Sequence, residues 1–147
     1  MNLSCWHIVK ILTFALGFSL SLPAGALARD DVPAEIAGLE NPADELSERD
    51  VRYFQRQFKA KCARCHGLDG AGGGGEAAAQ AVPPADFTDV SFMNRRTDGQ
   101  LFYQIFMGGG EACAMPAFGP ESSHAWNEEK IWRMVSFVRR FAQPPSP

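Results

Sequence analysis

Residues 62–66 read Cys-Ala-Arg-Cys-His, and this string decides how the rest of the chain is interpreted. The spacing C-x-x-C-H is the attachment signal for a c-type haem. Two thiols three residues apart can each reach one vinyl group of a porphyrin, and the adjacent His66 can offer a neutral imidazole nitrogen to the iron. The motif therefore predicts covalent attachment of one haem at Cys62 and Cys65, with His66 as an axial ligand.

Two other uses of a cysteine pair fit the sequence less well. A redox disulfide with this spacing is expected in a strand–helix–strand context, and no strand pattern precedes Cys62. Zinc would need further ligands, and the remaining candidates, Cys113 and His124, are single and distant in sequence. We therefore favour haem over both alternatives.

The iron needs a second axial ligand or an open site, and methionine and histidine are the usual choices for electron transfer. We expect Met115, because it lies in the loop-like stretch Ala-Met-Pro-Ala-Phe-Gly, where Pro116 fixes the backbone direction. Any of these methionines can instead fill a gap in the core. The competing candidates are Met93, Met107, Met134 and His124.

The N-terminal segment has the layout of a secretory signal peptide. Lys10 is followed by an apolar stretch from Ile11 to Leu22, and Ala26-Leu27-Ala28 resembles a cleavage site. We expect residues 1–28 to be removed and the remainder to reside in the periplasm, an oxidising compartment. The alternative is an uncleaved anchor, but no apolar run approaches the roughly 20 residues that a membrane-spanning helix needs.

The amino-acid composition of the whole chain is typical of a small globular protein. The 147 residues are 46% hydrophobic and 21% charged, which argues against disorder and fibrous folds. The formal net charge of −3 argues against a nucleic-acid partner. Three cysteines remain after residue 28, and this odd number cannot form a closed set of disulfides.

Helix signals recur along the chain, and no alternating strand pattern is present, so the predicted fold class is all-α with three or more helices and long loops. Ser47, Thr97 and Asn127 are candidate N-caps of three amphipathic helices, the last running from Glu128 to about Phe141. Residues 67–86 are glycine-rich loop with one possible helical turn. We expect an extended, partly ordered acidic arm over 29–47, a haem domain over 48–142 and a Pro-rich tail over 143–147.

Several strings resemble mono-haem class I cytochrome c, and the resemblance covers about residues 48–142. It is closest to bacterial periplasmic domains found alone or fused in cbb3-oxidase-like and dehydrogenase-associated cytochromes. The strings are Cys-His-Gly (65–67), the glycine-rich loop, Pro-Pro-Ala-Asp-Phe-Thr-Asp (83–89), Arg-Thr-Asp-Gly (96–99) and Met-Pro-Ala-Phe (115–118).

The resemblance implies thioether bonds from Cys62 and Cys65, His66/Met115 ligation, and first and last helices that cross beside the haem. It also implies that a proline carbonyl, from Pro83 or Pro84, holds the other nitrogen of the axial histidine. Two departures stand out. Many family members have glycine at the position of Phe54. Cys113 is also unusual, because it lies two residues before the expected ligand. We interpret Cys113 as a small buried residue, with a reactive thiol, an intermolecular disulfide or a replacement iron ligand as alternatives.

These features predict a periplasmic carrier of one electron rather than an enzyme, because no carboxylate pair or nucleophile–base string suggests a separate active site. Its partners would be a redox donor and acceptor: a dehydrogenase, an oxidase or another cytochrome. The alternatives are a cytochrome c subunit of a dehydrogenase or oxidoreductase complex, and a sensor or enzyme with an open iron position.

Overall fold

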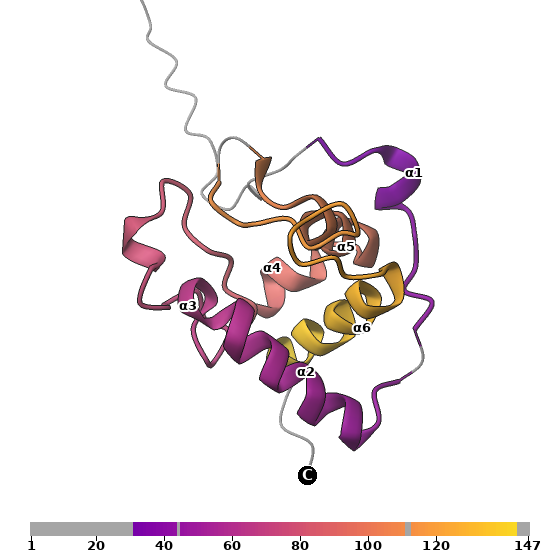
Figure 1. The fold of residues 1–147 in the computed structure, drawn as a ribbon, viewed down its shortest axis with the longest axis horizontal. Helices are drawn as coiled ribbons and strands as arrows, with labels where there is room; N and C mark the ends of the chain where they lie inside the picture. The colour runs from indigo at the N-terminus through magenta and orange to yellow at the C-terminus, as the bar shows by residue number, and fades with distance from the viewer. Residues whose placement is uncertain (1–30, 44, 111–112, 144–147) are drawn as a thin grey trace, which may run out of the picture.

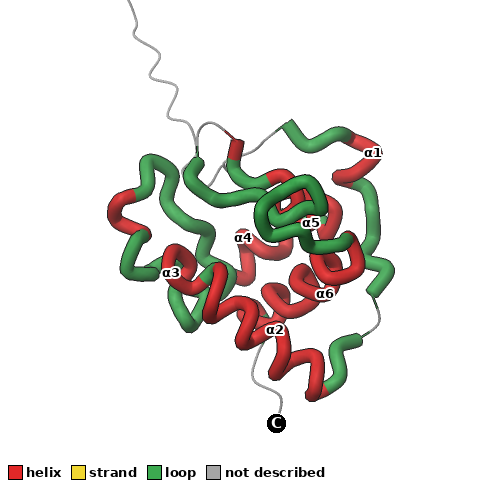
Figure 2. The backbone as a smooth tube through the Cα atoms, viewed as in Figure 1, coloured by secondary structure: helices red, strands yellow, loops and turns green. Residues whose placement is uncertain are grey.

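The computed structural model describes residues 31–43, 45–110 and 113–143, so the expected signal peptide and residues 144–147 of the expected tail lie outside the described residues. This part of the chain is helix and loop without a strand, which confirms the all-α prediction (Figure 2). The α-helices and 3-10 turns are α1 (Ala34–Ala37), α2 (Glu48–Lys61), α3 (Ala63–His66), η1 (Ala77–Ala79), α4 (Val90–Asn94), α5 (Asp98–Met107), α6 (Glu128–Arg139) and η3 (Arg140–Ala142).

The three longest helices begin at the predicted caps. The Ser47 and Thr97 hydroxyls each accept from a backbone N–H three residues on, and Asp50 and Gln100 return the bond, so both form capping boxes. The Asn127 side chain accepts from the third residue of α6 at 3.0 Å. Local side-chain chemistry therefore fixes where each of these helices starts.

The core lies where α6 packs against α2 and α5 (Figure 1). At the crossing of α2 and α6, Asp50 pairs with Arg133 at 3.5 Å and the rings of Phe58 and Phe137 lie 5.8 Å apart. Phe54, between these two contacts on α2, is only 2% exposed. The bulky residue that stands in the usual glycine position is therefore a buried core residue in this chain.

The arm before α2 is more ordered than the sequence suggested. Thr97 Oγ1 donates to the Ala37 carbonyl at 2.6 Å, and the Asn41 amide donates to the Trp132 carbonyl at 3.0 Å. A Cβ added at Gly99 would overlap the Ile36 carbonyl, so the first turn of α5 is in direct backbone contact with α1. The described part of the arm is packed against α5 and α6 because it has apolar side chains to bury there, namely Ile36, Ala43 and Leu46.

Candidate haem site

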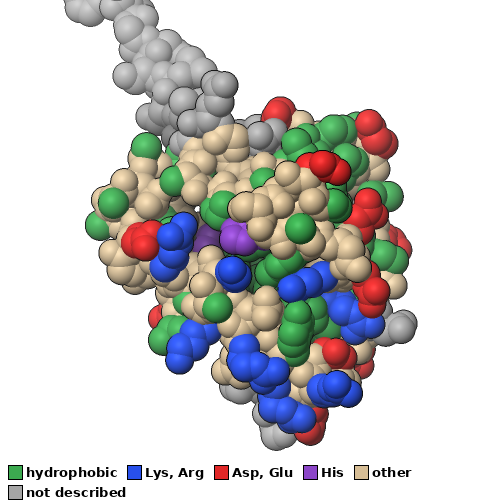
Figure 3. Space-filling model, in the orientation of Figure 1, with side chains coloured by type: hydrophobic (Ala, Val, Ile, Leu, Met, Phe, Trp, Pro, Cys, Tyr) green, Lys and Arg blue, Asp and Glu red, His purple; other side chains and the backbone are tan. Residues whose placement is uncertain are grey.

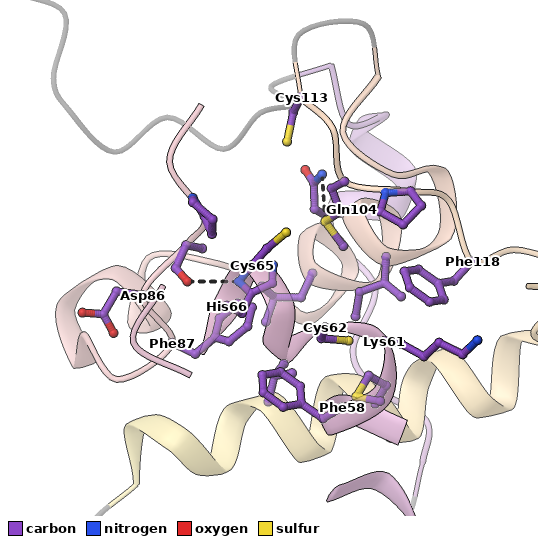
Figure 4. Close-up of a pocket in the computed structure, with 18 of the residues that line it drawn as sticks. Phe58, Lys61, Cys62, Cys65, His66, Asp86, Phe87, Gln104, Cys113 and Phe118 are labelled. Carbon is purple, nitrogen blue, oxygen red and sulfur yellow. Dashed lines mark hydrogen bonds between the residues drawn. The ribbon is translucent and has the colours of Figure 1, made fainter. Parts of the chain in front are cut away.

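An apolar cavity of about 440 Å³ opens beside α2 and α3 (Figure 4). Its walls come from the end of α2, from α3, from the loop over residues 80–87, from α5, and from residues 113–118. Cys62, Cys65, His66 and Met115, which sequence analysis selected as separate candidates, all line this one cavity.

A single turn of chain presents the two thiols and the imidazole. The Cys62 N–H donates to the Phe58 carbonyl at 2.8 Å and the His66 N–H donates to the Cys62 carbonyl at 2.9 Å, so the helical path continues from α2 into α3. Residues at positions i, i+3 and i+4 of a helix share a face. The spacing of Cys62, Cys65 and His66 therefore directs all three side chains into the cavity.

The orientation of His66 is fixed from two sides. Its ring stacks on Phe87 with centroids 4.6 Å apart, and Nδ1 lies 3.2 Å from the Ala85 carbonyl. A carbonyl can only accept, so Nδ1 carries the proton and Nε2 of the neutral ring keeps a free lone pair. Burial lowers the pKa of His66, partly opposed by the bond to Ala85, and the neutral form that binds iron is favoured.

The carbonyl beside His66 corrects one expectation. It belongs to Ala85 and not to Pro83 or Pro84. The Pro84 carbonyl faces Gly72 instead, where an added Cβ would come within 2.7 Å of it, and Pro83 is exposed. The Ala85 carbonyl lies 3.4 Å from the same added Cβ, so both carbonyls are close to the glycine loop, and that of Ala85 also reaches Nδ1 of His66.

The glycine cluster has a role that sequence analysis missed. Three backbone N–H groups of this loop, from Gly72, Gly74 and Glu76, donate to the carbonyls of His66, Cys65 and Arg64 at 2.8 to 3.0 Å. The carbonyls at the end of a helix have no helical partner, so the loop closes over the end of α3. A Cβ at Gly74 would overlap the carbonyls of α3, which explains why this contact requires glycine.

The segment after α5 turns back along that helix and brings Met115 to the cavity. Gly108 makes the turn with a φ of 72°, and the Gly109 N–H donates to the Met115 carbonyl at 2.9 Å. Farther on, the Phe118 N–H donates to the Ile105 carbonyl at 3.0 Å. One backbone bond at Met115 itself and another three residues later thus hold this loop against the C-terminal end of α5.

The other candidate ligands are placed differently. Met93 is buried within α4, Met107 is 41% exposed, and neither lines the cavity. His124 stacks on Phe118 at 4.3 Å and is also absent from the lining. Met134 does reach the cavity, but it is 1% exposed on the packed face of α6. Its position fits the core role that its stripe predicts.

Cys113 is half-buried and contributes to the cavity wall, where Figure 4 shows its sulfur pointing inward. Its side chain packs directly on Gly109, leaving no space for a Cβ there.

The Cys62 thiol is protonated in the fold without a cofactor. Burial raises the pKa of Cys62 to about 12, and nearby Cys65 adds to the rise.

The donor set fits a c-type haem. The cavity offers the paired thiols of Cys62 and Cys65, the neutral imidazole of His66 and the thioether of Met115 within largely apolar walls. Within the described ranges no group of three or more His, Cys, Asp or Glu side chains is placed to hold a metal ion. No helix in the described part of the chain has the length and apolar character needed to cross a membrane.

An all-helical fold with this motif turned into an apolar cavity defines a c-type cytochrome. Over residues 49–138 the chain matches the family described as "Cytochrome C oxidase, cbb3-type, subunit III", and it belongs to that family. This confirms the resemblance to class I cytochrome c, so the chain is a haem protein of electron transfer, and its family implies covalent attachment of a c-type haem.

The chain is also similar to two solved structures. The chain is similar, at 25% identity and a TM-score of 0.56, to a chain of the Kuenenia stuttgartiensis reducing HAO-like protein complex Kustc0457/Kustc0458. The match covers 73% of this chain and 49% of the other, so it spans about half of that neighbour. The KustC0563 c-type cytochrome matches at 24% identity and a TM-score of 0.46, over 60% of this chain and 96% of its own. No curated protein sequence matches.

Proposed function

We propose that the chain is a periplasmic electron carrier with one haem c, attached at Cys62 and Cys65 and ligated by His66 and Met115. The observation that supports this most directly is that all four side chains line one apolar cavity. Chance placement of a loop methionine beside a C-x-x-C-H turn is a weak alternative, because backbone bonds at Gly109 and Phe118 fix the loop on α5.

The residues around the cavity have distinct tasks. The Ala85 carbonyl and the Phe87 ring orient the imidazole of His66, and the apolar walls exclude water. When bound, haem supplies a one-electron ferric–ferrous couple whose potential depends on its axial ligands and surroundings. A thioether donor at Met115 favours the ferrous form, which suits a carrier of relatively high potential. No bond-making on a substrate is needed.

The basic charge on the α2–α3 side of the cavity supports docking by an acidic redox partner, although Asp86 and Asp89 also line the cavity and Arg64 pairs with Glu76 at 3.6 Å. Residues 51–66 contain five Lys or Arg and no Asp or Glu, although the whole chain is net acidic. Figure 3 shows Lys and Arg side chains gathered around the histidines on this face. Lys61 and Arg64 are exposed and line the cavity. Burial lowers the pKa of His124, and the charges of Lys61 and Arg64 lower it further. Complementary charge of this kind guides encounter between proteins.

The second candidate is a cytochrome c subunit of a dehydrogenase or oxidoreductase complex. It is favoured by the similarity to one chain of a protein complex. The match covers about half of the length of that chain. Native-size measurement of the protein purified from its own host distinguishes the two. A free carrier elutes at the size of one small domain, whereas a subunit co-elutes with a redox enzyme.

Attachment is tested by replacing both thiols. Cys62→Ala with Cys65→Ala should abolish haem that survives denaturation, whereas the wild type should carry one covalent haem by mass spectrometry and lack residues 1–28. Free thiols at both positions in the mature wild type would refute the proposal.

The ligand is tested separately. Met115→Ala should keep the haem attached but remove the weak ferric charge-transfer band of methionine ligation. Carbon monoxide should then bind the ferrous protein more readily. Met107→Ala is the matched control, since Met107 is exposed and outside the cavity. If Cys113→Ser removes the band and Met115→Ala does not, the assignment of Met115 as the ligand is wrong.

A further inference from the structure

Gln104 is the polar side chain that stands out in the cavity. It projects from α5 and is only 7% exposed, and it is the one buried polar side chain among the described residues. Its Nε2 donates to Met115 Sδ at 3.7 Å, drawn as a dashed line in Figure 4. The position follows from helix spacing, because Leu101, Gln104 and Ile105 share the face of α5 that lines the cavity.

The chemistry fixes which end of the amide faces the sulfur. A thioether can only accept a hydrogen bond, so the NH₂ group must point to Met115 and the oxygen must point elsewhere. That oxygen, Oε1, is buried and has no hydrogen-bond partner among the described residues. A buried acceptor without a partner destabilises the fold. An apolar side chain would fill the same space without this penalty, so packing alone does not account for glutamine here.

We propose that Gln104 is a positioning residue that holds the Met115 thioether in place for the haem iron. This inference rests on the proposed ligation by Met115. A sulfur that leaves the iron must also leave the amide N–H, so the hydrogen bond adds to the barrier against exchange of the ligand. The effect is local to one bond and does not depend on the stability of the whole fold.

The test uses the full-length, haem-loaded protein and imidazole as a competing ligand for ferric iron. Gln104→Leu removes the donor and keeps an apolar side chain of similar size. It should tighten the apparent imidazole dissociation constant about two- to tenfold, equivalent to about 0.4–1.4 kcal/mol for a net hydrogen bond. The midpoint of chemical denaturation should be unchanged or higher, since the unpartnered oxygen is removed as well.

The matched control is Gln57→Leu. Gln57 is half-buried on α2 and does not line the cavity. It should leave imidazole binding unchanged. A double-mutant comparison gives the decisive readout: with Met115→Ala already present, Gln104→Leu should have no further effect.

The failures can be told apart. If the wild type shows methionine ligation but Gln104→Leu leaves imidazole binding unchanged, the positioning role is refuted and the proposed function stands. If Gln104→Leu tightens binding equally in the Met115→Ala background, the residue controls access to the cavity and does not hold the sulfur. If the charge-transfer band is absent from the wild type or survives Met115→Ala, both the ligand assignment and the role of Gln104 are wrong.

Discussion

Replacing Phe54 with glycine, the residue common at this position in class I cytochromes c, should destabilise the protein severely. The Phe54 ring is 98% buried where α2 meets α6. Truncating a buried phenylalanine to alanine costs about 3–5 kcal/mol through lost apolar contact and the cavity left behind. Glycine inside a helix costs about 1 kcal/mol more than alanine. We therefore expect Phe54→Ala to lower the free energy of unfolding by about 3–5 kcal/mol and Phe54→Gly by about 4–6 kcal/mol.

The assay is guanidinium denaturation of the haem-loaded protein, followed by tryptophan fluorescence and by the haem absorption. Its control is Tyr53→Ala, an aromatic neighbour on the same helix that is 36% exposed and lies 5.5 Å from the Lys130 ammonium. This change should cost less than about 1.5 kcal/mol, as a partly exposed ring has less contact to lose. A loss below about 1.5 kcal/mol for Phe54→Gly would refute the packing described for the crossing of α2 and α6.

Three further changes test other contacts. Thr97→Ala removes a helix cap and a bond to the N-terminal arm and should lower stability by about 1–2 kcal/mol in urea denaturation, whereas Thr97→Ser should restore most of it. Gly74→Ala should reduce the yield of haem-loaded protein, measured by haem staining of denaturing gels, because its Cβ overlaps α3; Gly73→Ala, which meets open space, should not. Lys61→Glu should slow the oxidation of the ferrous protein by ferricyanide in low salt, because ferricyanide is an anion, and the difference from wild type should shrink as the salt concentration rises. Arg140 lies outside the cavity, so an equal effect of Arg140→Glu would contradict attraction by charge near the cavity.

The parts of the fold that sequence predicted are those governed by local chemistry. Ser47, Thr97 and Asn127 cap the helices expected of them, because a cap bond joins residues only three positions apart. The last helix was expected to run to about Phe141, but α6 ends at Arg139 and continues as the tighter turn η3. A change to 3-10 geometry at the end of a helix has little signal in sequence.

The parts that sequence did not predict depend on contacts between distant segments. Helix α4 has five residues, too few for an apolar period to show. Ala85 was missed in favour of the neighbouring prolines, since the direction of a carbonyl is set by the loop it packs against. The only sequence signal for Gln104 is that it is a polar residue within the apolar stripe of α5. Its partner could not be predicted, because the loop after α5 brings Met115 beside it only in the folded chain.

The crossing of α2 and α6 also bears on the order in which this protein folds. It joins the first long helix of the domain to the last, through Asp50 with Arg133 and Phe58 with Phe137. Contacts between such distant positions carry the entropy of closing a long loop before they contribute any stability, and they slow folding. The core cannot close until α6 has joined it. Because Met134 and Val138 of α6 line the cavity, the turn that carries Cys62 and Cys65 lacks this wall until α6 has packed.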